Sequence, residues 1–145
     1  MLQLIYTSVA TKPLSNTELN KLLNQSRLRN EFANVTGMLL FDRGTFLQVI
    51  EGPEYTIQKL YERIKADTRH QRMIVLSERR IKHREFSKWK MGYAHLAPRA
   101  LRDLPDYENY FEGDAGLSHC RQDAWLCRKI LEHFRDGLWQ REQAA

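Results

Sequence analysis

The segment FLQVIEGP, Phe46 to Pro53, joins an apolar strand directly to the start of a helix. Its β-branched and aromatic residues predict a strand from Thr45 to Glu51, and proline fits the first helical position. On the N-terminal side, the turn signal Asp42-Arg43-Gly44 separates this strand from another apolar run, Val35 to Phe41. Two apolar runs around a short glycine-containing turn predict a β-hairpin, which a helix follows at once.

Strand and helix patterns continue on both sides of this hairpin. Residues 2–8 form an apolar run that predicts a first strand, and residues 15–18 (Ser-Asn-Thr-Glu) form a capping box for a helix that fades near Asn30. After Pro53, apolar residues recur at i, i+3, i+4 and i+7 and predict a one-sided helix: Ile57, Leu60, Tyr61 and Ile64. Residues 73–81 and 89–96 predict a fourth strand and a short fifth strand.

This order of elements predicts an α+β fold, the ferredoxin-like β-α-β-β-α-β plan with one extra strand. Such a sheet carries both helices on one face, and we expect this unit to occupy residues 1–96. Residues 97–117 contain prolines, glycines and acids and predict a linker. From Ser118 onward an amphipathic helix is predicted, whose apolar face packs on the sheet or on another subunit: Cys120, Ala124, Cys127, Leu131, Phe134 and Leu138, widened by Trp125, Leu126 and Ile130.

Composition and charge narrow the class of protein. The 145 residues suit one ordinary domain, and no run approaches the length of apolar sequence that a membrane helix needs. The N-terminus lacks the pattern of a signal peptide, so we expect a cytoplasmic protein without membrane contact. Cys120 and Cys127 lie two helical turns apart, too far to bridge within one helix. The net charge of +5 is concentrated in residues 63–102, which indicates either a solvated strand edge and loop or an anionic partner.

Two polar residues interrupt apolar strands. Gln48 lies in the middle of the strand at 45–51, where alternation places it on one face with Phe46 and Ile50. A buried amide without a partner costs about 1–3 kcal/mol, so Gln48 either points to water, bonds to backbone, or has a dedicated partner. Tyr6 is similar, and either is a half-buried core residue or directs its hydroxyl to a partner.

Polar residues at the predicted helix ends have ordinary explanations as well. Asn30 would serve as a helix C-cap, and Arg69 and His70 suit the negative end of a helix dipole. The basic run from Arg79 to Arg84 is either a solvated turn or a recognition patch. Nucleotide-binding glycine loops, zinc-ligand spacings and nucleophile motifs are absent from the sequence, so neither an enzyme nor a metal site is expected.

Together these features resemble the BLUF family of blue-light sensors that use flavin. The resemblance covers the first two-thirds of the chain and rests on five segments in order: Leu4 to Ser8, Asn30 with Val35 to Leu39, Phe46 to Gly52, Asp67 to His70, and Phe86 to Met91. It implies a noncovalent flavin, FAD as the family norm with FMN as the alternative, held by the two helices on one face of the sheet.

The resemblance also implies roles for single residues. Tyr6 would be the light-driven electron and proton donor, with Gln48 between it and the flavin edge. The polar edge of the isoalloxazine would meet Asn30, and the other ring carbonyl would meet Arg69 supported by Asp67 and His70. The remaining implied contacts are Ser8 near the ring, Leu22 and Ile64 packed on it, Arg63 near the phosphate, and Trp89 and Met91 as the signal relay. Arg29 departs from the small polar or histidine residue expected beside the asparagine.

The chemistry of a flavin suits these residue types. The ring is flat and apolar with one polar edge, so it needs aliphatic walls and a few convergent donors and acceptors. An amide such as Gln48 offers one donor end and one acceptor end, so turning it exchanges the hydrogen bonds that it offers. We therefore expect a blue-light photoreceptor that signals to a separate protein partner or through a homo-oligomer. The alternatives are a ferredoxin-like nucleic-acid or regulatory binding module, with nucleic acid the less favoured partner, and a small flavoenzyme.

Overall fold

The computed structural model describes residues 1–87, 92–95, 117–118, 121 and 123–138. Its elements follow the predicted order: β1 (Leu2–Ala10), α1 (Asn16–Ala33), β2 (Thr36–Asp42), β3 (Thr45–Gly52), α2 (Glu54–Lys65), β4 (His70–Arg80), β5 (Gly92–His95), α3 (Ala124–His133) and the π-helical turn η2 (Phe134–Leu138). None of the helices in these described ranges is long and apolar enough to cross a membrane.

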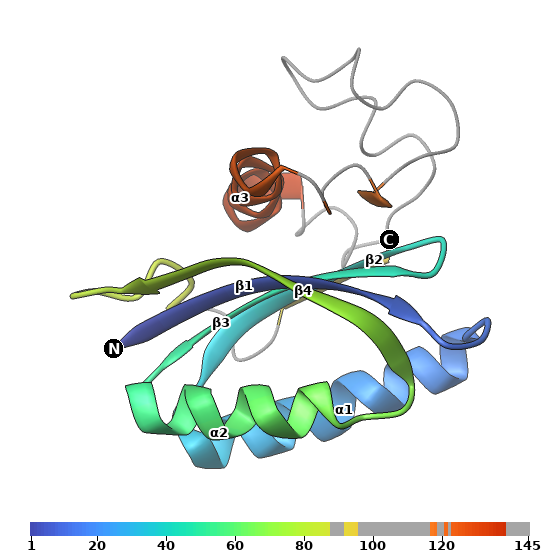
Figure 1. Ribbon diagram of the computed structural model, residues 1–145, viewed down its shortest axis with the longest axis horizontal. Helices are drawn as coiled ribbons and strands as arrows, with labels where there is room; N and C mark the ends of the chain where they lie inside the picture. The colour runs from blue at the N-terminus through green and yellow to red at the C-terminus, as the bar shows by residue number, and fades with distance from the viewer. Residues whose placement is uncertain (88–91, 96–116, 119–120, 122, 139–145) are drawn as a thin grey trace.

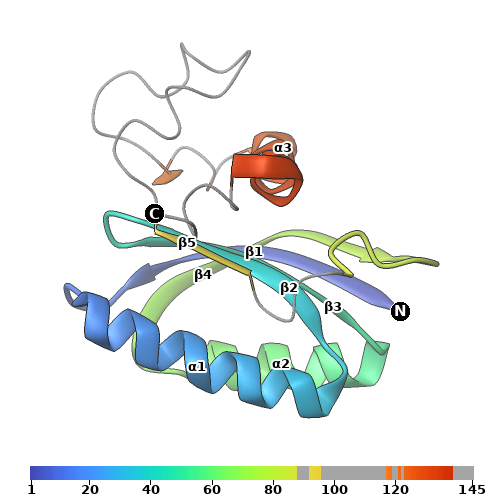
Figure 2. The same cartoon turned by 180° about the vertical axis from the view of Figure 1, so that it is seen from behind.

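Five strands form one sheet in the order β4-β1-β3-β2-β5. Neighbouring strands are antiparallel except β5, which pairs parallel to β2. Helices α1 and α2 lie side by side on one face, and α3 lies across the opposite face (Figures 1 and 2). The predicted ferredoxin-like plan with one extra strand and a C-terminal helix is therefore confirmed.

Strand alternation divides the interior into two apolar layers. Between the sheet and the α1/α2 pair lies one cluster, which includes Leu39, Phe46 and Ile50. Between the sheet and α3 lies the other, which includes Leu47 and Val49. Successive residues of β3 therefore point to opposite layers. This arrangement confirms that Gln48 shares a face with Phe46 and Ile50, and it places that face under α1 and α2.

The turn of the β2–β3 hairpin and the C-terminal end of α1 contain residues with left-handed backbone dihedral angles. Asp42 pairs with Thr45, so the β2–β3 loop has two residues, Arg43 at φ 44° and Gly44 at φ 86°, as a type I′ turn requires. The Ser15 hydroxyl caps the first turn of α1 at Glu18 N–H (3.1 Å), as predicted. The helix continues past the predicted end to Ala33.

Asn34, at φ 57° and ψ 43°, is the C-cap of α1. Asn30 lies one turn earlier and only its backbone carbonyl takes part in the cap, accepting from the N–H groups of Asn34 and Val35. The expectation that Asn30 itself is the C-cap is therefore wrong, because an asparagine closer to the hairpin takes the left-handed conformation that ends the helix. The side chain of Asn30 is left for another role.

The second helix and the fourth strand also have shifted bounds. Helix α2 ends at Lys65, and β4 begins at His70 rather than Met73. Asp67 and Arg69 therefore lie in the connecting loop, not in the last helical turn. The positive φ of Arg72, 53°, and two register shifts against β1 bend β4 strongly over α2 (Figure 1). This bend brings the α2–β4 loop close to β1.

The C-terminal helix begins later than predicted. Asp123 accepts the N–H of Leu126 (3.0 Å) and caps α3, so the helix starts at Ala124 and not at Ser118. The predicted apolar face is buried at Leu126, Cys127, Ile130, Leu131 and Phe134. Ala124 is exposed and Trp125 is 58% exposed, so neither belongs to that face. Cys120 and most of the predicted linker lie outside the described residues.

A polar network attaches α3 to the sheet. The buried carboxylate of Glu51 accepts the N–H groups of Phe86 (2.7 Å) and Glu85 (3.0 Å) and the amide of Gln3 (2.8 Å). The Gln3 carbonyl in turn accepts from Arg128 of α3 (3.0 Å) and from Arg79 of β4 (3.0 Å). These contacts join three strands, the loop after β4 and α3 around one buried glutamate.

The basic run after β4 is used within the molecule. Arg79 pairs with Glu85 (2.5 Å), and Arg80 pairs with Glu54 (3.1 Å). Arg84 donates to the carbonyls of Glu51 (2.9 Å) and Asn34 (2.7 Å). Guanidinium groups that are committed to internal carbonyls and carboxylates are less available to a polyanion, which disfavours the interpretation as a recognition patch.

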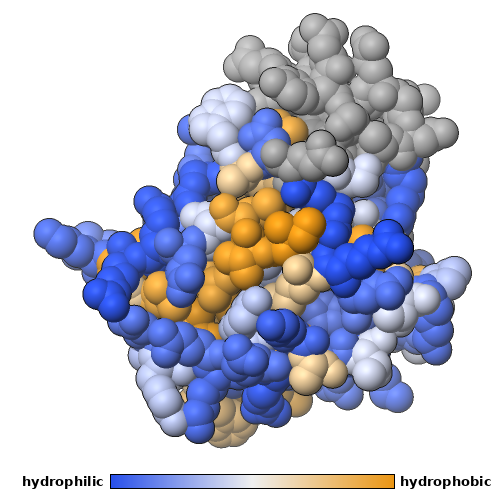
Figure 3. All heavy atoms as spheres, viewed as in Figure 1, coloured by the Kyte–Doolittle hydropathy of each residue, from blue (hydrophilic) through white to orange (hydrophobic). Residues whose placement is uncertain are grey.

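Strand β4 forms an uncovered edge of the sheet. Its Ile74 and Val75 are 39% and 40% exposed, and apolar atoms gather along this strand between α2 and α3 (Figure 3). Bent, bulged edge strands resist pairing with other sheets. The side chains of this patch are therefore exposed to solvent, while the irregular backbone of β4 disfavours pairing with a further strand.

We predict that Glu51→Gln lowers the free energy of unfolding by about 1–3 kcal/mol, because each carboxylate oxygen accepts a backbone N–H at this buried site and the amide nitrogen would replace one of these acceptors with a donor. Urea denaturation followed by circular dichroism measures the change. Glu54→Gln, which alters an exposed carboxylate paired with Arg80, is the control and should change the free energy by less than about 0.5 kcal/mol. Equal effects of the two substitutions would contradict the central position of Glu51.

Candidate functional site

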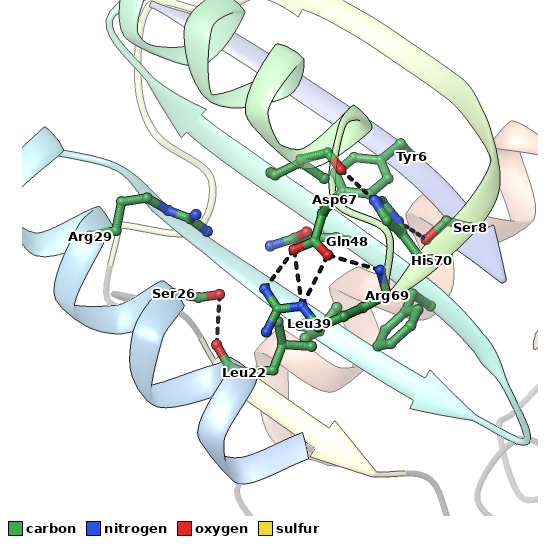
Figure 4. A pocket seen from close by; sticks show the side chains of 12 residues that line it. Tyr6, Ser8, Leu22, Ser26, Arg29, Leu39, Gln48, Asp67, Arg69 and His70 are labelled. Atoms are coloured by element: carbon green, nitrogen blue, oxygen red, sulfur yellow. Dashed lines mark hydrogen bonds and ion pairs between the residues drawn. The ribbon is translucent and has the colours of Figure 1, made fainter. Parts of the chain in front are cut away.

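A pocket opens between the sheet and the two helices that cover it (Figure 4). It encloses about 550 Å³ of space free of atoms, part of it open to solvent. Strands β1, β2 and β3 supply its floor, α1 and α2 its sides, and the α2–β4 loop one end. The lining residues are Tyr6, Ser8, Leu22, Ser26, Arg29, Leu39, Phe46, Gln48, Ile64, Asp67, Arg69 and His70.

Tyr6 and Gln48 face the pocket from the two central strands. They are direct partners in the β1–β3 register, and Leu39 of β2 is the partner of Gln48 on its other side. Tyr6 is 2% exposed and Gln48 is 7% exposed. Cross-strand partners have side chains that emerge on the same face, with Cβ atoms about 4.5–5.5 Å apart. A phenol and an amide are thus neighbours on the pocket floor, and Gln48 does not point to bulk water.

Burial raises the pKa of the Tyr6 phenol well above its ordinary value. The positive charge of Arg29 opposes this rise, and the negative charge of Asp67 adds to it. The phenol therefore keeps its proton throughout the physiological pH range. Any loss of that proton must be driven by a change in the pocket rather than by pH.

His70 connects the floor to α2. Its Nε2 contacts the carbonyl oxygen of Ile64, and its Nδ1 lies 2.8 Å from the hydroxyl of Ser8. A carbonyl can only accept, so Nε2 carries a proton. In the neutral ring Nδ1 then accepts from Ser8. This bridge fixes the distance between β1 and the C-terminal end of α2, and with it the width of the pocket at that end.

Asp67 and Arg69 form a compact pair at the mouth. Arg69 Nη2 donates to Asp67 Oδ2 (2.5 Å), Arg69 Nε donates to Oδ1 (3.0 Å), and the Arg69 backbone N–H also donates to Oδ1 (2.9 Å). Hydrogen bonding to Arg69 lowers the pKa of Asp67, and the same bond raises the pKa of Arg69. Arg69 Nη1 reaches Gln25 of α1 (3.2 Å), so the pair links both sides of the pocket.

Two neighbouring residues of α1 keep polar atoms without partners. Asn30 is 1% exposed, and its Oδ1 has no hydrogen-bond partner among the described residues. The same is true of the buried Nε of Arg29. Orphaned buried polar atoms are rare in folded proteins and call for an explanation such as a missing ligand. A ligand that offers both hydrogen-bond donors and acceptors would satisfy them.

Most of the residues implied by the sequence meet in this pocket. Leu22 and Ile64 are partly buried wall residues, one from each helix. Asn30 and Arg63 are not among the lining residues: Asn30 lies buried on α1, and Arg63 is exposed on α2. Trp89 and Met91 lie outside the described residues. Among the described residues no group of three or more potential metal ligands occurs.

Four lining residues were not assigned to the site from the sequence, although each left a usable signal. Phe46 was placed on the face of Gln48 without being assigned to the site, and Leu39 follows from the same alternation. Ser26 lies one helical turn after Leu22, whose carbonyl accepts its hydroxyl (3.0 Å). Arg29 was noted only as unusual, although it lies seven residues after Leu22 and three after Ser26, on the same helical face, and its side chain lines the pocket (Figure 4).

We predict that Ser8→Ala and His70→Ala are energetically coupled. Each should lower the free energy of unfolding, and the double variant should lose less than the sum by about 0.5–1.5 kcal/mol, because the second change removes a hydrogen bond already broken. Chemical denaturation of the four proteins measures the cycle. Strictly additive losses would show that the Ser8–His70 contact contributes nothing to stability.

Comparison with known proteins gives consistent results. A family model described as BLUF, sensors of blue-light using FAD, matches residues 1–92. The alpha subunit of a photoactivated adenylate cyclase from Euglena gracilis is 36% identical over 96 residues, and the beta subunit from Euglena longa is 33% identical over 92 residues. These matches cover 65% and 63% of this chain but only 9% and 11% of those relatives.

Comparison with solved structures also finds BLUF proteins. The dark state of BlrB, a BLUF protein, superposes with a TM-score of 0.70 and 31% identity over 91% of this chain and 96% of that one. BlrP1 of Klebsiella pneumoniae, solved with FMN and cyclic diGMP, superposes with a TM-score of 0.64 and 25% identity, covering 94% of this chain and 35% of that one.

Proposed function

We propose that this chain, which belongs to the BLUF family of flavin-binding blue-light sensors, detects light through a hydrogen-bond rearrangement between Tyr6, Gln48 and the flavin. The observation that carries the proposal is the direct pairing of Tyr6 with Gln48 on the pocket floor. The family module is a sensor, so we assign these residues to signalling and not to catalysis.

The pocket suits an isoalloxazine ring. Leu22 and Ile64 offer aliphatic surface from the two helices, and we propose that they pack on opposite sides of the ring. The orphaned Oδ1 of Asn30 is an acceptor for a ring N–H. We propose that Arg69, held by Asp67, donates to a ring carbonyl, that Ser8 and His70 border the ring, and that the exposed Arg63 approaches the phosphate.

The flavin, when bound, supplies the absorption of blue light and the capacity to accept an electron. The protein supplies orientation. Tyr6 holds its proton in the dark because burial raises its pKa, and it is the oxidisable group on the floor. Gln48 stands beside it and can pass a proton or exchange its donor and acceptor ends. An amide turned in this way offers a different hydrogen bond to the ring edge and to the sheet.

Flavin binding by itself does not specify whether the ligand is FAD or FMN. The family description names FAD, and one structural relative was solved with FMN. We propose FAD as the native ligand. Release of the flavin from purified protein followed by mass spectrometry distinguishes the two.

We propose that the signal leaves the pocket along the edge of the sheet through Trp89 and Met91 to the C-terminal helix. Support comes from the position of α3, whose apolar face covers the side of the sheet opposite the pocket. The strands that carry Tyr6 and Gln48 also carry Gln3 and Glu51 of the polar network that holds Arg128. A displacement of β1 or β3 would therefore reach α3 through these contacts.

The receiver of the signal, the subunit number and the cytoplasmic location stay predictions. The relatives include photoactivated adenylate cyclases, of which this chain spans about a tenth. We propose that this chain signals either to a separate protein partner or through a light-dependent change of its oligomeric state. Sedimentation velocity in darkness and under blue light tests the change of oligomeric state.

We predict that Tyr6→Phe and Gln48→Leu each retain flavin but lose the reversible light-induced red shift of the absorption spectrum. The first removes the hydroxyl that is oxidised and deprotonated, and the second removes the switchable amide, while the walls of the pocket remain. Absorption spectra before and after blue light measure the outcome. Tyr61→Phe, at a half-buried tyrosine of α2 that does not line the pocket, should keep the shift. A normal shift in Tyr6→Phe would refute the donor role.

We predict that blue light increases hydrogen exchange in residues 124–138, and that Met91→Ala reduces this increase while leaving the red shift intact. The reason is that Met91 is proposed to act after the Tyr6–Gln48 rearrangement. Hydrogen exchange with mass spectrometry in darkness and light gives the answer. If the wild-type protein shows no light-dependent exchange in α3, the signal leaves by another surface.

A further inference from the structure

Arg29 is the polar residue of the pocket that the proposed contacts leave unexplained. It extends from α1 toward the space between the helices (Figure 4) and lines the pocket. Its Nε is buried and has no hydrogen-bond partner among the described residues. The resemblance to BLUF sensors leads one to expect a small polar residue or histidine at this position, and this chain has arginine instead.

No direct ion pair compensates the charge of Arg29 in the described part of the chain, and only the more distant charge of Asp67 acts in its favour. Arg69 nearby is, by contrast, neutralised by Asp67 at 2.5 Å. Burial lowers the pKa of Arg29, and the positive charges of Arg63 and Arg69 lower it further. An arginine remains charged even so. A half-buried cation without a directly paired counter-charge is costly unless a ligand supplies negative charge or strong acceptors.

The position of Arg29 in the pocket indicates which part of a bound flavin it would contact. Arg29 is close enough to Tyr6 for its charge to oppose the effect of burial on the phenol. It lines the pocket together with Gln48 and Tyr6, the residues proposed to face the ring, whereas Arg63 is exposed and outside the lining. The cation would therefore meet a bound ring rather than a solvent-exposed phosphate.

We propose that Arg29 stabilises negative charge on the reduced isoalloxazine ring and so raises the reduction potential of the bound flavin, an inference that rests on the proposed function. The same charge repels a positive charge on Tyr6. It therefore favours transfer of an electron from Tyr6 to the ring together with loss of the phenol proton toward Gln48, which leaves a neutral tyrosyl radical. Arg29 thus sets the reduction potential of the flavin, which is the electron acceptor for Tyr6.

The test is the midpoint potential of the flavin in the holoprotein, measured in darkness by reductive titration with a reference dye. Arg29→Gln should shift the equilibrium about tenfold toward oxidised flavin, which is a decrease of about 30 mV for a two-electron couple. Arg29→Lys keeps the charge and should lie within about threefold of the wild type. Lys21→Gln removes an exposed charge of α1 that does not line the pocket, and it should also stay close to the wild type.

A second variant covers the case in which Arg29→Gln does not hold flavin. Arg29→Ser introduces a small polar residue of the kind expected at this position, and it should show the same decrease. An unchanged potential in these variants overturns the proposal. Weaker binding of FMN with unchanged binding of riboflavin and an unchanged potential would instead assign Arg29 to the phosphate. Wild-type protein that stays colourless after refolding with FAD would refute the proposed function itself.

Discussion

The register between β1 and β3 is the constraint on which the rest of the structure depends. It sets Tyr6 directly opposite Gln48 and gives both side chains to the face under α1 and α2. A shift of one residue would move every side chain of a strand to the other face. The two apolar layers forbid such a shift, because Leu47 and Val49 are buried against the α3 side while Phe46 and Ile50 are buried on the other. The stability of the sheet therefore fixes the geometry of the Tyr6–Gln48 pair, which we propose to be photoactive.

The same sheet connects the pocket to the opposite face. The pocket lies on the side of α1 and α2, and the polar network around Glu51 lies where β1, β3 and α3 meet. Both depend on the two central strands. Gln48 lies three residues before Glu51, whose buried carboxylate holds the loop after β4. That loop leads toward β5. The arrangement gives the proposed signal a short path that consists of packed elements.

Much of this architecture could be predicted from the sequence, and the failures have physical causes. Alternation and helical spacing predicted the element order and the face of Gln48, and the resemblance to the BLUF family implied the walls Leu22 and Ile64. The end of α1 was misplaced because two asparagines were available and only Asn34 adopts the left-handed conformation. The start of α3 was misplaced because the apolar pattern extends before Asp123, whose carboxylate caps the helix. Arg29 was not placed in the pocket, because spacing along a helix does not reveal how far a flexible side chain reaches.

The central claim is that light changes the hydrogen bonds between the Gln48 amide and the flavin. Light-minus-dark infrared difference spectroscopy of the holoprotein tests it directly, because a carbonyl that gains a hydrogen bond vibrates at lower frequency. The account predicts a reversible downshift of a flavin carbonyl band in the wild type and its absence in Gln48→Leu. A downshift that persists in Gln48→Leu would contradict the account, because the changed hydrogen bond would then come from another group.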